Sequence, residues 1–413
     1  MRNFHIALYT LTSPLHDEVA VNAVSNVFVK EIEDALNMSF DFRGKDFSRY
    51  GDSDLDIIYV RTGGTEGLFK EIYSQLKGNI LLLTSGKSNS LAASLEIMSY
   101  LGQQFRSGEI LHGKTSYIAE RIMKLAKISV ARRALNNINL GVIGQPSDWL
   151  ISSDADRTKV RKTVGINLVD IPIQELIGKI RTAETGTFSP EIRSELMRCP
   201  SEAVRNYAEG AMKIYAALKD IISRYNLSGL TLRCFDLLDT VGNTGCLALA
   251  MLNSEGIPAG CEGDVPALLT MTIGKALTGQ CGFQSNPSRI DPQTGEILLA
   301  HCTIPFDMVR KYSFNTHFES GIGVAVHGEM PLGDATIFKV SGDMSGSFSA
   351  EADLLANQYE DNLCRSQIVL KIKKDPQKIC SDYFLKNPIG NHHIVFSGSH
   401  KEIFDEFMAK INF

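Results

Sequence analysis

DIIYVRTGGTEGLF occupies residues 56–69, and ILLLTSGKSNSLAASLEIMSYL occupies residues 80–101. Each stretch begins with apolar residues typical of a buried strand, continues with a glycine-rich turn, and ends in a pattern typical of a helix. The repeated order of strand, turn and helix is the pattern of a parallel sheet with helices on both faces. The N-terminal region is therefore predicted to be a doubly wound α/β domain.

A second region repeats this alternation after a predicted helix at residues 116–134 and its polar tail. Pro200 and Ser201 open a helix with one apolar face, and Asp264 followed by Pro266 fits the cap and first turn of another. Strand-like apolar runs accompany these helices at residues 140–143, 166–171 and 229–235. We therefore predict a second doubly wound α/β domain.

The pattern changes after Gly282. Short β-type runs, separated by Gly, Asp and Ser, follow one another with no strong helix before the amphipathic tail at residues 401–413. The predicted fold class is therefore α/β, with two doubly wound Rossmann-like domains followed by a β-rich C-terminal domain whose terminal segment returns to the second domain. The predicted domains are residues 1–137, 138–295 and 296–413.

The composition excludes several classes of protein. The 413 residues carry 42 basic and 47 acidic side chains, a formal net charge of −5, whereas nucleic-acid binding needs a basic face. No apolar run reaches the length of about 20 residues that crosses a bilayer, and the N-terminus lacks the layout of a signal peptide. Eight cysteines without a CxxC pair indicate reduced thiols. We expect a cytoplasmic protein without a nucleic-acid or membrane partner.

Histidines cluster towards the C-terminus. Imidazole binds transition metals and transfers protons near neutral pH, although most buried histidines are structural groups. His392 and His393 are adjacent in a strand-like segment, so their side chains are expected on opposite faces and only one of them would face a site. The histidines beyond residue 300 are His301, His317, His327, His392, His393 and His400.

Glu262 and Asp264 lie in the motif CEGD, directly before a predicted helix. The positive end of the helix dipole favours ionised carboxylates there, which suit Mg²⁺ or Mn²⁺. Asp264 is also explained as the cap of the helix, so Glu262 is the more informative residue. His317 and Glu319, in the loop THFESGIG, have a structural alternative as a turn contact or ion pair. Trp149, the only tryptophan, either packs in a core or stacks on a sugar.

Two glycine-rich loops follow the N-terminal strands, TGGTE at residues 62–66 and TSGKSN at residues 84–89. Their backbone N–H groups can bind anions or sugar hydroxyls. Neither loop has the GxxxxGK[ST] spacing of a P-loop, and GxGxxG is absent. Nothing therefore indicates a nicotinamide cofactor.

Three motifs together resemble one family of enzymes. CEGD followed by a helix and LTG, then THFESGIG, and then GNHHIVFSGSH occur in the order and rough spacing of the C-terminal region of L-fucose isomerase and L-arabinose isomerase. The resemblance covers residues 261–400, and the N-terminal half is similar only in its α/β character and the TGGTE loop. It implies an enzyme that interconverts aldoses and ketoses through an enediol, with a divalent metal that is usually Mn²⁺.

The resemblance also implies roles for individual residues. Glu262 corresponds to a catalytic carboxylate of the fucose enzyme. His393 corresponds best to its metal-binding histidine, with His392 as the alternative register. His317 corresponds to a further histidine ligand of the arabinose enzyme.

The chain departs from the family where further acidic ligands are usual. Ser285 or Asn286 stands in place of the second acidic ligand, and Ala300 or His301 stands where another carboxylate is expected. A site with fewer anionic ligands would bind Mn²⁺ weakly unless another acid is recruited, and the candidates are Glu319, Asp264 and Asp291.

We therefore expect a divergent, homo-oligomeric aldose–ketose isomerase that acts on a small sugar. Two alternatives on the same fold stay open, a metal-assisted aldolase or epimerase and a sugar-binding paralogue that has lost the metal. The predicted catalytic residues are Glu262, Asp264 and Glu319. The predicted Mn²⁺ ligands are Glu262, His393, His317 and Ser285, and the predicted substrate-binding residues are His301, Asn286, His392 and Trp149.

Overall fold

The computed structural model describes residues 4–411. The chain divides into two compact units, Met1–Val130 and Ala131–Phe413. The first unit is built on a five-stranded parallel sheet in the order β2-β1-β3-β4-β5. Its strands are β1 (Ile6–Leu11), β2 (Asp41–Gly44), β3 (Leu55–Val60), β4 (Ile80–Leu83) and β5 (Gly108–Leu111).

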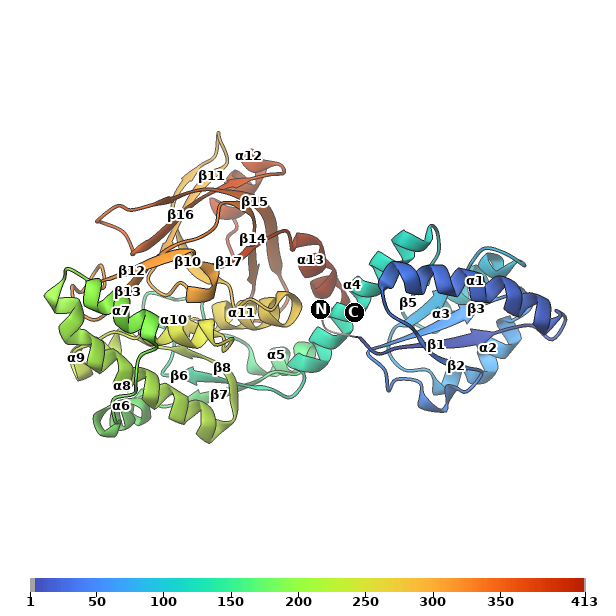
Figure 1. Cartoon of the computed structure of the whole chain (residues 1–413), viewed down its shortest axis with the longest axis horizontal. Coiled ribbons are helices and arrows are strands. Elements are labelled where there is room, and N and C mark those ends of the chain that lie inside the picture. Colours follow the sequence, from blue (N-terminus) through green and yellow to red (C-terminus); the bar gives the residue numbers. More distant parts are fainter. Residues whose placement is uncertain (1–3, 412–413) are drawn as a thin grey trace. The chain divides into compact units, whose positions relative to one another are not determined.

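Helices cover both faces of this sheet, as the alternating pattern predicts. Apolar side chains of α1 and α4 pack with one face, and those of α2 and α3 pack with the other (Figure 1). The doubly wound arrangement of the N-terminal unit is thereby confirmed. The helices are α1 (Glu18–Leu36), α2 (Glu66–Ile72), α3 (Ser90–Gln103) and α4 (Thr115–Leu135).

The second unit begins with a four-stranded parallel sheet in the order β7-β6-β8-β9. Its strands are β6 (Asn139–Ile143), β7 (Asn167–Ile171), β8 (Leu227–Leu232) and β9 (Ala259–Cys261). The accompanying helices are α5 (Arg157–Val164), α6 (Ile173–Thr182), α7 (Pro190–Arg198), α8 (Glu202–Tyr225), α9 (Asp236–Val241), α10 (Cys246–Ser254) and α11 (Val265–Thr278).

Two of these helices begin where the sequence predicts. The Ser201 side chain accepts a hydrogen bond from the Val204 backbone N–H at the start of α8. Asp264 accepts one from the Ala267 backbone N–H at the start of α11. Pro266 lies in the first turn of α11, and Gly279, in the left-handed conformation, ends it. The caps fix α11, and with it the residues just before it, relative to the end of β9.

The C-terminal region is β-rich, as predicted, but it closes into a six-stranded barrel in the order β10-β11-β16-β15-β14-β17. The barrel strands are β10 (Phe283–Asp291), β11 (Glu296–His301), β14 (Gly333–Val340), β15 (Ser347–Gln358), β16 (Ser366–Ile372) and β17 (His393–Ser397). A separate hairpin joins β12 (Lys311–Asn315) to β13 (Ala325–Glu329), and the remaining helices are α12 (Pro376–Lys378) and α13 (Lys401–Ile411). Short 3₁₀-helical turns lie at Phe47–Arg49, Tyr73–Gln75 and Phe306–Met308, and a π-helical segment lies at Ile379–Phe384.

The barrel begins with β10, so the expected boundary at residue 295 falls in the turn between two paired strands. Near the end of the chain, β17 pairs with both β10 and β14 and packs against α11. The division of the second unit into two domains stays a prediction.

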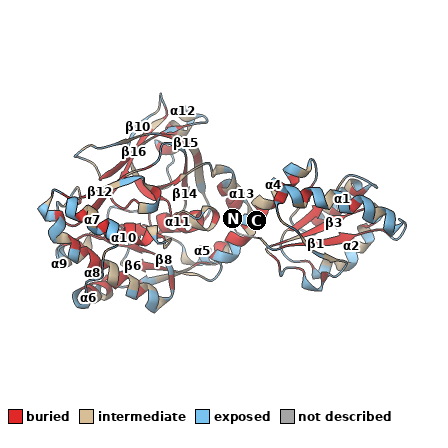
Figure 2. Ribbon diagram, in the orientation of Figure 1, coloured by how far each residue is buried: buried red, intermediate tan, exposed pale blue. Residues whose placement is uncertain are grey.

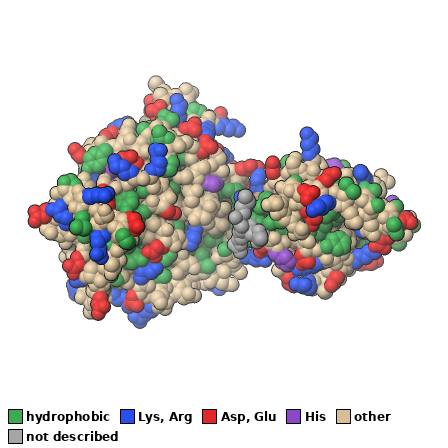
Figure 3. All heavy atoms as spheres, in the orientation of Figure 1, with side chains coloured by type: hydrophobic (Ala, Val, Ile, Leu, Met, Phe, Trp, Pro, Cys, Tyr) green, Lys and Arg blue, Asp and Glu red, His purple; other side chains and the backbone are tan. Residues whose placement is uncertain are grey.

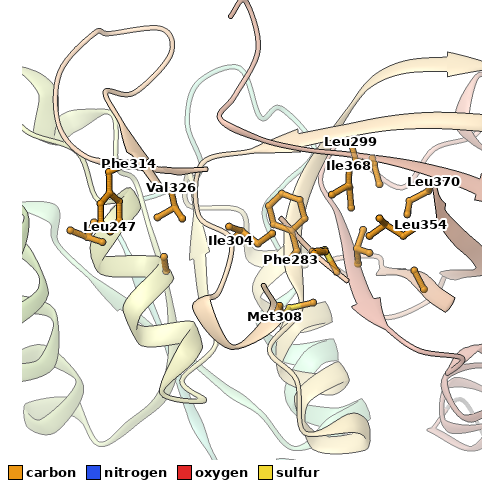
Figure 4. Close-up of a cluster of buried hydrophobic side chains, with 14 of the residues drawn as sticks. Leu247, Phe283, Leu299, Ile304, Met308, Phe314, Val326, Leu354, Ile368 and Leu370 are labelled. Atoms are coloured by element: carbon orange, nitrogen blue, oxygen red, sulfur yellow. The ribbon is translucent and has the colours of Figure 1, made fainter. Parts of the chain in front are cut away.

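One buried apolar cluster joins the helices of the second unit to its barrel. Leu247 of α10, Phe283 of β10 and Leu370 of β16 belong to this cluster, and Figure 4 shows it running from helix to barrel strands. Figure 2 shows α10, α11 and the central strands β1, β3 and β8 as largely buried. This common core fixes α8 and α10 relative to the barrel, and the candidate site lies where the end of β9 meets the barrel strands β11 and β17.

All eight cysteines are free thiols, in agreement with their predicted reduced state. Within residues 4–411, no helix is long and apolar enough to cross a membrane. On the face of the second unit visible in Figure 3, acidic and basic side chains are interspersed rather than gathered by sign.

Candidate functional site

Three segments far apart in sequence bring their polar side chains together in the second unit. Glu262 directly follows β9, His301 ends β11, and His392 directly precedes β17. The carboxyl end of a parallel strand is the usual place for a ligand site in an α/β sheet. Among the described residues, Glu262, His301 and His392 form a group whose potential metal-ligand atoms lie within 4.8 Å of one another. All three side chains are buried.

The backbone of Glu262 is held in an uncommon conformation. Its φ is 62°, in the left-handed region that non-glycine residues rarely adopt. Its carbonyl accepts a hydrogen bond from Ser147 at 2.9 Å, and a Cβ on the neighbouring Gly263 would lie 2.4 Å from the carbonyl oxygen of Gln145. Strain of this kind persists only where the surroundings impose it, and it is common at functional sites.

Each oxygen of the Glu262 carboxylate faces different partners. Oε2 accepts a 2.7 Å hydrogen bond from the indole N–H of Trp149. Oε1 lies 3.4 Å from Nε2 of His392 and 3.6 Å from Nε2 of His301. Burial alone would raise the pKa of Glu262, but the two imidazoles outweigh burial and hold this pKa well below its usual value. Glu262 is therefore ionised at neutral pH.

His392 is oriented by a second carboxylate. Its Nδ1 donates to Oδ2 of Asp264 at 2.8 Å, and both side chains are fully buried. This bond leaves Nε2 of His392 facing Glu262, where it is buried and makes no hydrogen bond. A carboxylate behind a histidine is the usual support of a metal-binding imidazole.

His301 completes the group. Its ring lies 5.4 Å from the ring of His392, centre to centre, in an edge-on arrangement. Nδ1 of His301 lies 3.1 Å from the hydroxyl oxygen of Thr303, which can accept its proton and so leave Nε2 free as a ligand.

Two observations indicate that these residues can bind a divalent cation. Nε2 of His392 is a buried polar atom without a hydrogen-bond partner, and such groups are usually satisfied by something. One carboxylate and two imidazoles are ligands typical of first-row transition metals such as Mn²⁺, Fe²⁺ or Zn²⁺. The site can therefore hold a metal ion.

The other member of the histidine pair, predicted as the ligand, does not join Glu262. Nδ1 of His393 lies 2.9 Å from the carbonyl oxygen of Asn391, so it carries the proton and donates. Nε2 then accepts from the hydroxyl of Tyr383 at 2.8 Å. Burial, together with the nearby charge of Lys339, lowers the pKa of His393 to about 3. This neutral imidazole has no lone pair left for a metal.

Alternation along the strand explains the difference. His393 shares a strand face with Val395, which belongs to the buried apolar cluster, and its neighbour His392 points to the other side. Ser285, predicted as a weak ligand, pairs with His393 in the β10–β17 ladder and donates its hydroxyl to the His393 carbonyl at 3.2 Å. The structure therefore places Ser285 with His393 and away from the group around Glu262.

The remaining predicted residues lie outside the three-residue group. Asn286 accepts a hydrogen bond from Asn391, and the buried His317 pairs with Ser320 at 3.0 Å. Glu319 lies between His317 and Ser320 in sequence, and it is exposed. Asp264 is fully buried behind His392, and its two oxygens accept hydrogen bonds from His392, Ser153 and the Ala267 backbone.

Trp149 lies at the edge of the site rather than in a core. Its indole is 54% exposed, although its N–H is bonded to Glu262. Phe235 packs edge-on against Trp149 at 4.7 Å, and His317 packs against Phe235 at 5.5 Å. The three rings form a partly exposed aromatic border beside the buried donors.

Sequence reasoning missed Lys339, Thr303 and Ser153. Lys339 lies 3.7 Å from Asp264, and Ser153 donates to the same carboxylate at 3.3 Å. Lys339 had a usable signal, because it occupies the same strand face as Ala335 and Ile337 in an otherwise apolar run. Thr303 and Ser153 are ordinary loop residues without such a signal.

The metal-free site should bind Mn²⁺ more tightly as the pH rises. Burial disfavours a charged His392, but Asp264 and Glu262 outweigh burial and raise its pKa to about 9. This proton stabilises the folded metal-free protein most below the ordinary histidine pKa of about 6.5, and that contribution is lost as the pH approaches 9. Because Mn²⁺ must displace this proton, its affinity should rise by up to about 10-fold per pH unit between pH 6.5 and 8.5.

Titration of Mn²⁺ at several pH values, followed by the fluorescence of Trp149, measures this dependence. The carboxylates of Glu262 and Asp264 have lowered pKa values and stay ionised across this range, so they should not contribute. An affinity independent of pH would contradict a role for His392 as a ligand.

No family model matches the chain. Sulfoquinovose isomerases from Priestia aryabhattai and Clostridium sp. (strain MSTE9) are 24% and 25% identical to it over 242 and 263 residues. The matches cover 54% and 59% of this chain and 52% and 57% of the relatives, so the chain spans about half the length of the curated relatives it matches. A sulfoquinovose isomerase from Alkalicoccus urumqiensis is 20% identical over 234 residues. These matches support a relationship to sugar isomerases.

Proposed function

We propose that this chain is an aldose–ketose isomerase with its active site at Glu262, His301 and His392. The observation that carries the proposal is the buried Nε2 of His392, which faces the other two donors without a hydrogen bond of its own. The similarity to sulfoquinovose isomerases and the resemblance to the L-fucose and L-arabinose enzymes support the same reaction class. Homo-oligomeric assembly stays part of the proposal.

In this proposal Glu262, His301 and His392 hold a divalent cation, with Mn²⁺ as the first candidate. When bound, the cation supplies a Lewis acid that polarises the carbonyl and the neighbouring hydroxyl of the sugar. Asp264 holds the imidazole of His392 from behind, at 2.8 Å. Trp149 holds one oxygen of Glu262 and offers a partly exposed aromatic face to the sugar.

We assign proton transfer to the ionised carboxylate of Glu262. It takes the proton from C2 of the aldose to give an enediol and returns a proton to C1, while the hydroxyl proton moves from O2 to O1. The sugar isomerises without a net change of composition, so no external oxidant or reductant is needed, and the proton held by Glu262 exchanges with water before one is returned to C1. In this proposal Asp264 acts through His392, because its two oxygens already accept hydrogen bonds from His392, Ser153 and the Ala267 backbone.

Incubation of the full chain with Mn²⁺ and candidate sugars in D₂O tests the proposal. Sulfoquinovose is the first sugar to try because the relatives carry that name, followed by L-fucose and L-arabinose. We expect a ketose product that carries deuterium. An epimer or a cleaved sugar would favour the epimerase or aldolase alternative, and binding without turnover would favour a sugar-binding paralogue.

A further inference from the structure

Lys339 is a buried charge without an evident role in the proposed reaction. It lies on β14, is 1% exposed, and its Nζ makes no hydrogen bond among the described residues. Its nearest acidic partner is Oδ1 of Asp264, at 3.7 Å. A buried ammonium carries a desolvation penalty of several kcal/mol unless it is paired and hydrogen-bonded. The incomplete pairing of Lys339 therefore calls for an explanation.

Asp264 connects this lysine to the site. Its Oδ1 accepts the 2.7 Å cap bond from the backbone of Ala267 and faces Lys339. Its Oδ2 accepts from His392 at 2.8 Å and from Ser153 at 3.3 Å. The two oxygens therefore contact different groups: Oδ1 contacts the helix cap and Lys339, and Oδ2 contacts His392.

The orientation of His392 follows from that division. With Nδ1 bonded to Asp264, the ring can present only Nε2 to Glu262, 3.4 Å away. Attraction between Lys339 and Oδ1 opposes a rotation of the carboxylate that would remove Oδ2 from His392. Lys339, Asp264 and His392 thus form a continuous buried series from the barrel strand β14 to the donor group.

We propose that Lys339 is a positioning residue that acts through Asp264 to hold His392 with Nε2 directed at the metal-binding donors. This inference rests on the proposed function, because it assigns Lys339 to the metal affinity of that same site. Outer partners of metal ligands commonly contribute about 10- to 100-fold to metal affinity.

A purely structural role predicts a different result when the charge is removed. Methionine has nearly the length of lysine and no charge, and Asp264 keeps its hydrogen bonds from His392, Ser153 and the Ala267 backbone when the lysine is replaced. If Lys339 only fills space, Lys339→Met should leave Mn²⁺ affinity unchanged. If it positions Asp264 and His392, affinity should fall although the fold is retained.

The experiment compares wild type, Lys339→Met, Lys339→Arg and the control Lys373→Met. Lys373 directly follows β16, pairs with Asp334 and Asp353, and its side chain is one-third exposed, so its replacement leaves the site untouched. Mn²⁺ affinity is measured by the fluorescence of Trp149 and by bound metal after dialysis, and thermal unfolding is followed without metal.

We expect Lys339→Met to bind Mn²⁺ at least about 10-fold more weakly while it still folds and unfolds cooperatively on heating, and Lys339→Arg to recover part of the affinity. Wild-type affinity in Lys339→Met would overturn the inference while the proposed function stands. A Lys339→Met chain that fails to fold, or a loss shared equally by Lys373→Met, would overturn it too. Wild-type protein without Mn²⁺ affinity would instead refute the proposed function.

Discussion

Glu262→Gln is expected to eliminate measurable Mn²⁺ binding and to lower turnover by about 10²- to 10⁴-fold, the range typical of losing a positioned acid–base group. Glutamine keeps the volume of the side chain and can still accept the indole hydrogen bond of Trp149. The change therefore removes the negative charge between two imidazoles and leaves the packing in place. Metal content after dialysis and the rate of ketose formation measure the two effects.

Glu319→Gln is the matched control for this substitution. Glu319 was a sequence candidate for the catalytic site, but its side chain is exposed in a turn. Its replacement should leave Mn²⁺ affinity and turnover within a factor of about two, as expected for a surface change. Retained metal binding and turnover in Glu262→Gln would refute the isomerase proposal, and a large loss in Glu319→Gln would show that the site extends to the THFESGIG loop.

The parallel sheets were predictable because local signals specify them. A buried strand, a glycine turn and an amphipathic helix recur within about 30 residues, so neighbouring segments already indicate the βαβ unit. The barrel was not predictable in the same way. Its closure depends on β17 pairing with both β10 and β14, which precede it by many residues, and no local pattern records such a pairing.

The residues of the site also divide into those that the local sequence predicts and those that only long-range strand pairing brings together. Asp264 was recognisable as a helix cap, and Glu262 followed from its place beside that cap and from the resemblance. The choice between His392 and His393 was not available from sequence, because a shift of one residue in strand register exchanges the two faces. His301 was expected to contact substrate, and only the pairing of β11 in the barrel places it beside Glu262.

His392→Gln and His393→Gln should have opposite effects, although the two residues are adjacent. His392→Gln removes the imidazole whose Nε2 faces Glu262, so Mn²⁺ affinity should fall by more than about 100-fold, beyond the loss typical of an outer partner. His393→Gln should leave Mn²⁺ affinity within a few-fold of wild type. Fluorescence titration with Mn²⁺, under the same conditions for both variants, measures the contrast.

The losses of folding stability in the same two variants should show the reverse order, with the larger loss in His393→Gln. His393 uses both ring nitrogens in buried hydrogen bonds, to Asn391 and Tyr383, and its ring packs against Phe384 at 4.9 Å. Its replacement should lower the free energy of unfolding by about 1–3 kcal/mol, because glutamine leaves at least one buried partner unsatisfied. In His392→Gln the new amide can still donate to Asp264, which limits the loss of stability. If His393→Gln instead abolished Mn²⁺ binding and His392→Gln retained it, the strand register would be the one implied by the family resemblance, and the site assigned to Glu262, His301 and His392 would be wrong.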